Sequence, residues 1–376
     1  MPPAVASEIR SLTAGPLNWD SLLADASYHS VTPLLAKQLT TIAGDALSSA
    51  QLELLKGLAR ITAVRNLALT AELIAILDVF RSEGVQAIPY KGPVLAAQAY
   101  GDFTLREFED LDLILRQKDM PKANRFVTSL GYRAKYPWTL SVDAAASLVP
   151  GEYCYRNERR RMIVDLHTER TLRHFPLTPD IDALAERLMR VSLGGHVIET
   201  FGPEDGLSLL CIHGSKDFWE RISWIADVAE LVQAHPRLDW DQVIRRAESL
   251  RAVRMLHLGL ALAIGFFDLS LPDEISRRVN ADEIAGVLSR EIELRIFHDG
   301  ANSLGAAGRF WFRRRMLDGI FEGWRYSARL TVSPAEEDWE MVRLPRPLAP
   351  LYVALRPLRL LLKYGVSDAR PLRRSA

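Results

Sequence analysis

The fold is decided by one stretch that runs from Lys91 to Leu115 and reads KGPVLAAQAYGDFTLREFEDLDLIL. It predicts a glycine turn at Lys91-Gly92, followed by a short helix from Pro93 to about Tyr100. Proline suits the first helical position, where its missing N–H costs nothing. After a loop, alternating apolar and acidic residues predict a strand from Asp110 to Leu115.

Two aspartates of this strand carry the first chemical signal. Side chains alternate along a strand, so Asp110 and Asp112 point to the same face. Two neighbouring carboxylates repel each other unless positive charge lies between them. A divalent metal commonly supplies that charge, and such metals commonly serve phosphate chemistry.

The flanking sequence predicts the rest of a small sheet. Apolar runs bounded by turn residues indicate strands at 85–90 and 132–136, with a helix opening at Asp119-Met120-Pro121 between 119 and 130. Residues 152–156 and 162–166 read as an antiparallel pair. The second of these ends in Val164-Asp165-Leu166, which places a third aspartate at the end of a short strand.

Helical periodicity dominates on both sides of this sheet. Leucine, isoleucine and alanine recur at helical spacing between residues 51 and 80, and residues after 176 return to helical patterns. The predicted fold class is therefore α+β, with a small mixed β-sheet. We expect an N-terminal helical segment at 1–80, a core at 81–170 and a large C-terminal helical region at 171–376.

Nucleotidyl transfer fits the residues in this order. The reaction needs two metal ions about 4 Å apart, a clamp for the triphosphate and a place for the acceptor. Asp110, Asp112 and Asp165 can supply the metal ligands. Gly92 provides a turn whose backbone can approach phosphates, and Lys91 and Arg106 can supply positive charge to the triphosphate.

Three further residues have two interpretations each. His167 follows Asp165 closely and either reaches the nucleotide or supports a metal carboxylate through a hydrogen bond. His213 and Lys216 lie in a segment that, if helical, presents them to nucleotide or acceptor. The alternative for that segment is a solvated helix face backed by an aromatic core.

Composition limits the classes of function. The 376 residues contain 47 Lys plus Arg and 47 Asp plus Glu, so net charge is zero, which argues against a long nucleic-acid footprint. Two cysteines without CxxC spacing argue against structural zinc and a disulfide framework. No run reaches membrane-spanning length, and we expect a cytoplasmic protein. The arginine- and leucine-rich tail at 351–362 can make weak contact with a membrane surface or pack on the protein.

The combined pattern resembles a known family. Lys91-Gly92, Tyr100, Arg106, Asp110-Leu111-Asp112, Leu130-Gly131-Tyr132, Val164-Asp165-Leu166-His167 and His213-Gly214 look like the bacterial nucleotidyltransferase-like family of the DNA polymerase beta-type superfamily. The resemblance covers roughly residues 30–365. It implies metal ligation by Asp110 and Asp112, with Asp165 as third ligand or as base. Many relatives have Gly-Ser where this chain has Gly92-Pro93, which makes Lys91 the substitute for the missing hydroxyl.

The expected function is Mg²⁺-dependent transfer of an NMP group from an NTP such as ATP, with release of pyrophosphate. We expect two Mg²⁺ ions, with Mn²⁺ as a substitute. The acceptor is a small molecule, a peptide or RNA. Two alternatives stay open: a non-catalytic nucleotide-binding or scaffold protein of a biosynthetic complex, and a toxin-type tRNA nucleotidyltransferase.

Overall fold

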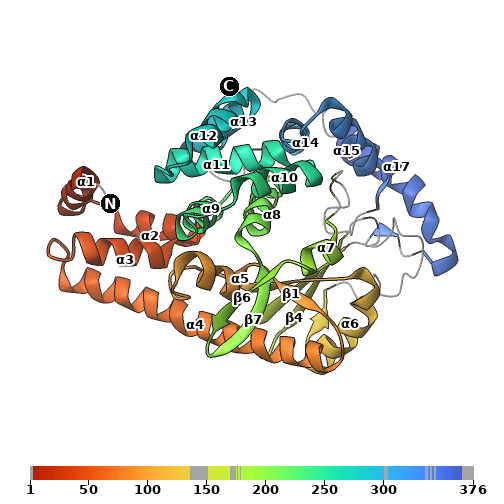
Figure 1. Ribbon diagram of the computed structural model, residues 1–376, viewed down its shortest axis with the longest axis horizontal. Coiled ribbons are helices and arrows are strands. Elements are labelled where there is room, and N and C mark those ends of the chain that lie inside the picture. The colour runs from red at the N-terminus through yellow and green to blue at the C-terminus, as the bar shows by residue number, and fades with distance from the viewer. Residues whose placement is uncertain are drawn as a thin grey trace, which may run out of the picture.

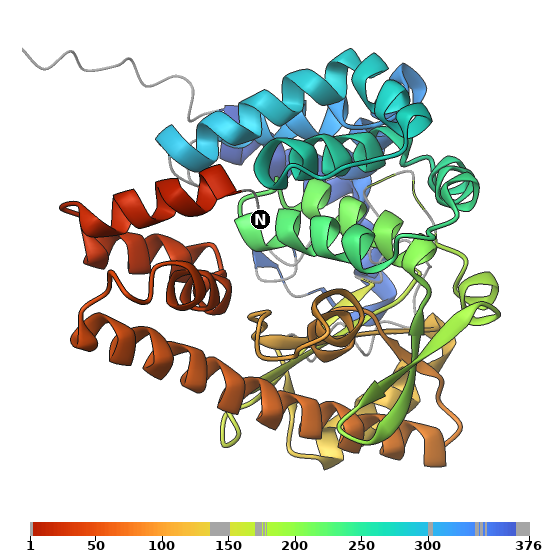
Figure 2. The ribbon, with the colours of Figure 1, turned by 60° about the vertical axis from the view of Figure 1, so that its left-hand side comes forward.

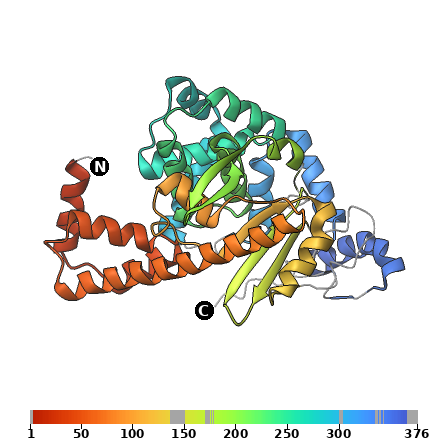
Figure 3. The same ribbon diagram turned by 60° about the horizontal axis from the view of Figure 1, so that its bottom comes forward.

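The N-terminal part is a group of helices that ends in one long helix. The computed structural model describes residues 3–135, 151–169, 179–299, 304–334 and 344–365, together with residues 175, 177, 338, 341 and 342. Helix α4 starts in a capping box, in which Ser48 and Gln51 bond to each other's backbone N–H groups. It then runs from the N-terminal helices to the far side of the sheet (Figure 1 and Figure 3). The helices are α1 (Pro3–Ala14), α2 (Trp19–Tyr28), α3 (Thr32–Ile42) and α4 (Ser49–Ser82).

A five-stranded mixed sheet forms the centre, with the strand order β1-β2-β5-β4-β3. Strands β2 and β5 pair in parallel, and the other neighbours pair antiparallel. This confirms the predicted α+β class and the mixed sheet. The strands are β1 (Ala87–Pro89), β2 (Asp110–Leu115), β3 (Arg133–Ala134), β4 (Glu152–Asn157) and β5 (Met162–His167).

The two faces of the sheet differ in chemistry because side chains alternate along each strand. One face is apolar and contributes Leu111, Leu113 and Val164 to a core shared with α4 and α6 (Met120–Ser129). The opposite face carries acidic side chains, and Lys216 pairs with Glu152 on it, so this face turns toward the C-terminal helices. The ribbon of these helices lies above the central strands in Figure 2. The aspartates therefore lie between two layers of structure.

Three short helical segments complete this central part. Helix α5 (Gly92–Leu95) continues into the π-helical turn η1 (Ala96–Tyr100), and both connect β1 to β2. The 3-10 turn η2 (Gln117–Asp119) leads into α6. The predicted helix over 93–100 is thus present, but it changes its hydrogen-bond pattern halfway.

The region after residue 170 is not purely helical, which corrects our expectation. Strands β6 (Leu188–Leu193) and β7 (His196–Phe201) form a two-stranded antiparallel hairpin that follows α7 (Ile181–Ala185). Gly194 and Gly195 both adopt positive φ at the turn, as tight hairpin turns require. Two alternating runs joined by Gly-Gly were the signal for this hairpin in the sequence.

Helices α8 to α11 build a second core. Trp219 is fully buried between α8 and α11, and a Cβ at Gly214 or Gly259 would meet its ring at 2.6 or 3.1 Å. Only glycine lets the two helices approach this closely around the indole. The helices after the hairpin are α8 (Pro203–Lys216), α9 (Ile222–Ala234), α10 (Trp240–Leu250), α11 (Val253–Phe267), α12 (Asp273–Ala281), α13 (Glu283–Leu294), α14 (Ala306–Arg315), α15 (Ile320–Val332) and α17 (Tyr352–Gly365), with short turns η4 (Arg295–Asp299) and η5 (Arg346–Leu351).

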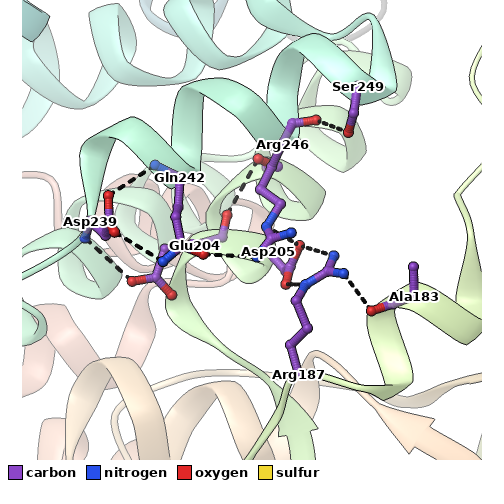
Figure 4. Close-up of polar contacts among 9 residues, drawn as sticks. Ala183, Arg187, Glu204, Asp205, Asp239, Gln242, Arg246 and Ser249 are labelled. Atoms are coloured by element: carbon purple, nitrogen blue, oxygen red, sulfur yellow. Dashed lines mark hydrogen bonds and ion pairs between the residues drawn. The ribbon is translucent and has the colours of Figure 1, made fainter.

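A polar network fixes the start of α8. Asp205 accepts two hydrogen bonds of 2.9 Å from Arg187 and lies 3.2 Å from Arg246 of α10 (Figure 4). Arg187 also donates to the carbonyl of Ala183 in α7. Asp205 therefore joins α7, α8 and α10 at the end of α8 opposite the residues predicted to function.

The C-terminal helix α17 contains the tail for which the sequence leaves two possibilities open, weak contact with a membrane surface or packing on the protein. Arg356 and Arg359 are buried and both pair with Asp338, while Leu358, Leu361 and Leu362 are exposed. The two arginines are thus engaged within the protein, and contact with a membrane surface stays a prediction. In the part of the chain that the structure describes, no helix combines the length and apolarity needed to cross a bilayer.

Candidate active site

The structure brings the three predicted aspartates onto one face. Strands β2 and β5 are parallel neighbours, and their register sets Asp112 opposite Asp165 and Asp110 opposite Ile163. The next strand, β4, adds Glu152 opposite His167 and Cys154 opposite Asp165. Three adjacent strands therefore present acidic side chains to the same space.

Asp112 is held at both of its carboxylate oxygens. The Lys91 ammonium lies 2.9 Å from Oδ2, and His167 Nε2 lies 2.8 Å from Oδ1. Burial alone would raise the pKa of Asp112, but the ammonium and the imidazole lower it well below its usual range. The same carboxylate, assisted by Asp110, raises the pKa of Lys91 against the effect of burial. Both side chains are therefore charged at neutral pH.

Asp110 and Asp165 lack such compensation. Burial, and then the charge of Asp112, raise the pKa of Asp110 to about 6. Burial also raises the pKa of Asp165, whose Oδ1 is buried without a hydrogen-bond partner among the described residues. Cys154 shares a hydrogen bond with this carboxyl group. These two carboxylates are short of positive charge.

The Lys91-Gly92 turn lies directly against the aspartate strand. Gly92 has a φ of +52°, and a Cβ there would lie 3.5 Å from the carbonyl oxygen of Asp110 and near Phe108. A side chain would strain this backbone and narrow the approach to Asp110. The turn positions the Lys91 ammonium next to the Asp112 carboxylate.

Arg106 occupies a different place from the one expected for a triphosphate ligand. Its guanidinium forms a bidentate pair with Asp227 of α9, with distances of 2.7 and 2.8 Å. Tyr100 donates a third hydrogen bond to Asp227, at 2.8 Å. Arg106 and Asp227 are 8% and 2% exposed, so the pair joins the aspartate loop to the C-terminal helices. Contact between Arg106 and a triphosphate stays a prediction.

His213 and Lys216 sit at the end of α8 that faces the sheet. His213 Nδ1 lies 3.2 Å from Asp217, and burial together with Lys91 and Lys216 lowers the pKa of His213 well below its usual value, leaving a neutral imidazole. The Lys216 ammonium lies 3.1 Å from Glu152. Burial opposes ionisation of Glu152, but Lys216 outweighs it and lowers the pKa of Glu152 to about 2.

A cavity of about 380 Å³ opens in front of Asp110 and Asp112. Its walls come from the aspartate strand and turn, from α8 and α9, and from the turn after α2, where Arg221 donates a 2.6 Å hydrogen bond to Ser30. Its lining residues include Ser30, Lys91, Gly92, Arg106, Glu107, Phe108, Glu109, Asp110, Asp112, His213, Asp217, Glu220, Arg221, Ser223 and Trp224. A larger hollow of about 620 Å³ beside β6 and β7 contains none of the predicted site residues.

The donor set fits a divalent cation whose coordination is completed by substrate oxygens. Among the described residues, no three His, Cys, Asp or Glu side chains converge as ligands of one ion. Magnesium often binds through one or two carboxylates plus substrate phosphates. Asp110 and the unpartnered oxygen of Asp165 are carboxylate donors of that kind.

Comparison with known families decides the class of protein. The profile of a family described as uncharacterised nucleotidyltransferase matches residues 15–268. The chain belongs to this family. The predicted membership of an uncharacterised nucleotidyltransferase family is thereby confirmed, and the protein is a nucleotidyltransferase.

Two solved structures show limited likeness. One is the antibiotic-resistance factor ANT(2'')-Ia, which is 13% identical with a TM-score of 0.35 and covers 49% of this chain and 91% of its own. The other is an antigenic nucleotidyltransferase-like protein from Paracoccidioides brasiliensis, which is 12% identical with a TM-score of 0.37 and covers 57% and 92%. No curated protein matches the chain.

Sequence reasoning missed Glu152 and the pairing of Arg106 with Asp227. Glu152 had a readable signal, because it starts a predicted strand next to β5 and shares the alternation that orients Cys154. The Arg106 pair had none, since 121 residues separate its members and only the packing of α9 brings them together.

Proposed function

We propose that the chain transfers an NMP group from an NTP to an acceptor in the cavity in front of Asp110 and Asp112, with release of pyrophosphate and dependence on Mg²⁺ or Mn²⁺. The observation that carries this proposal is the pair of carboxylates, Asp110 and Asp165, that have no ion-pair partner among the described residues on the sheet face behind the cavity. Asp110 opens onto the cavity, and Asp165 has an oxygen without a partner. When bound there, a divalent cation supplies charge that holds the triphosphate and stabilises its transition state.

The chain's own residues divide the remaining tasks. Asp110 and Asp165 offer oxygen ligands, and Asp112 orients Lys91 and His167. Gly92 keeps the backbone beside Asp110 open to a phosphate group. His213 lines the cavity as a neutral imidazole, so it can accept a hydrogen bond from an acceptor hydroxyl while Asp217 holds its other nitrogen.

The test is transfer of label from α-³²P-NTPs to candidate small molecules, peptides and RNA, with pyrophosphate release measured in parallel. We expect Asp110→Asn to lose at least about 100-fold in rate, because it removes an oxygen ligand at the reacting phosphate. Asp182→Asn is the matched control, since that carboxylate is exposed and pairs with Arg116 outside the cavity. Equal rates for wild type and Asp110→Asn would contradict the proposal.

A non-catalytic nucleotide-binding protein is the second candidate, favoured by the engagement of both Asp112 oxygens. It predicts tight binding of Mg²⁺-ATP or Mg²⁺-GTP without pyrophosphate release from any acceptor mixture. Growth arrest on expression that disappears in Asp112→Asn would instead favour the toxin-type reaction on tRNA.

A further inference from the structure

The Lys91 ammonium occupies a position that is unusual for a triphosphate ligand. It lies 2.9 Å from Asp112 Oδ2, and the two side chains are only 10% and 5% exposed. The turn at Gly92 places Lys91 in the wall of the cavity, where its ammonium is held against the Asp112 carboxylate. The other oxygen of Asp112 is bound by His167. The negative charge of Asp112 is therefore already balanced by the Lys91 ammonium.

Counting charges on the sheet face shows what is still missing. Four carboxylates lie there, Asp110, Asp112, Glu152 and Asp165, and two ammonium groups face them, Lys91 and Lys216. Arg156 lies on the same face beside Cys154, but its side chain is exposed to solvent, which screens its charge. Lys91 and Lys216 pair with Asp112 and Glu152, and among the described residues neither Asp110 nor Asp165 has an ion-pair partner. One divalent cation neutralises these two carboxylates. A second one would place surplus positive charge in the face before any nucleotide binds.

The carboxylate oxygens that have no lysine partner point to the same single cation. These oxygens belong to Asp110 and Asp165. Asp110 lines the cavity, and Asp165 Oδ1 is buried without a partner among the described residues. The leftover ligands thus flank Asp112, whose own oxygens are engaged.

From this we infer that the site binds one divalent cation and that the Lys91 ammonium takes the place of the second metal ion expected from the sequence. This inference rests on the proposed function, because it assumes that the nucleotide binds at this face. Lys91 then acts as a positioning residue that neutralises Asp112. In the opposite arrangement, the Lys91 ammonium moves from Asp112 to the triphosphate. A second metal ion then binds Asp112 in its place.

The experiment counts bound Mn²⁺ by electron paramagnetic resonance. Purified full-length chain is titrated with Mn²⁺ alone and with α,β-methylene-ATP or α,β-methylene-GTP present. We expect one Mn²⁺ per chain in every condition. Two Mn²⁺ per wild-type chain with either analogue would overturn the inference.

Variants at Lys91 give an independent readout. Lys91→Met removes the charge while keeping the length of the side chain, so a second Mn²⁺ is expected to bind at Asp112. Lys118→Met is the matched control at an exposed lysine and should stay at one ion. A folded Lys91→Met chain that binds a single Mn²⁺ would also overturn the inference. If circular dichroism shows that this variant is unfolded, Lys91→Arg replaces it, keeps the charge and should stay at one ion; two ions there would count against the inference.

Failure of the inference and failure of the proposed function are distinguishable. A chain that transfers label with two Mn²⁺ bound keeps the function and loses the inference. A chain that binds one Mn²⁺ with nucleotide but transfers no label keeps the inference and loses the catalytic proposal.

Discussion

Two buried aspartates of this protein are each held by two basic side chains, yet their surroundings differ. Asp205 receives Arg187 and Arg246, so at that point positive charge exceeds negative charge (Figure 4). Asp112 receives Lys91 and His167, but Asp110 and Asp165 beside it have no ion-pair partner among the described residues, and their pKa values are raised. The first cluster fastens α7, α8 and α10, whereas we propose that the second binds a divalent cation. If the proposed function holds, this difference separates a structural ion pair from a functional one.

The largest expected effect comes from neutralising each aspartate in turn. We expect Asp112→Asn to lower the transfer rate by at least about 100-fold, because the Lys91 ammonium loses its anchor next to the reacting phosphate. Asp205→Asn should leave the rate within a few-fold and lower the free energy of unfolding by about 1–3 kcal/mol. Its two arginines are 29% and 24% exposed, which keeps this cost below that of a fully buried pair.

Rates at saturating NTP and urea unfolding curves check both statements. Lys91 keeps Asp110 as a neighbouring counter-charge, so Asp112→Asn should destabilise the protein no more than Asp205→Asn does. Loss of activity in Asp205→Asn while it is still folded would remove the distinction between the two clusters.

A smaller effect concerns the pH dependence of stability without metal. The pKa of Asp110 is raised to about 6 in the folded protein, above its unfolded value. Between about pH 4 and pH 6 the folded state therefore binds more protons at Asp110 than the unfolded state does. Stability should fall as pH rises through this window, by roughly 2 kcal/mol. Asp112 and Glu152 have lowered pKa values, so their opposite effects lie mainly below the window.

Urea unfolding in EDTA at half-unit pH steps measures this slope. We expect Asp110→Asn to flatten it, because an amide does not titrate. If the Asp110→Asn variant has the same pH slope as wild type, the pKa of Asp110 is not raised in the folded protein. The sheet face would then carry less surplus negative charge than we infer.

The smallest effect is expected at an exposed pair beside the same strand. Arg65 lies 3.2 Å from Glu109, and their side chains are 49% and 67% exposed. Arg65→Ala should change the free energy of unfolding by 0 to about 1 kcal/mol and leave the transfer rate unchanged. Thermal unfolding and the label-transfer assay measure this variant in parallel with the two aspartate variants. A larger loss would show that solvent screens this region less than its exposure implies.

The sequence predicted the aspartate strand correctly because alternation and turn residues are local signals. Strand β2 has the predicted bounds, and the shared face of Asp110 and Asp112 follows from the period of a strand. The neighbouring strand with Asp165 was also readable. These features depend on a few consecutive residues.

The partners of the charged groups could not be predicted in the same way. Lys91 and Arg106 are both basic residues near the aspartates, but one pairs with Asp112 and the other with Asp227. Which carboxylate each cation meets depends on how α9 packs over the loop, and no local pattern encodes that. The hairpin of β6 and β7 was missed for another reason, since its Gly-Gly turn was visible but lay within a region dominated by helical periodicity.

The pairing of Arg106 with Asp227 has a consequence for the order in which the protein becomes functional. During synthesis, Asp110 and Asp112 leave the ribosome more than one hundred residues before His213 of α8 and before Trp224 and Asp227 of α9. In a nascent chain, the acidic strand β2 is therefore exposed before α8 and α9 can cover it. The cavity arises only when the later helices dock, so an incomplete chain has the carboxylates but no enclosed place to bind a nucleotide.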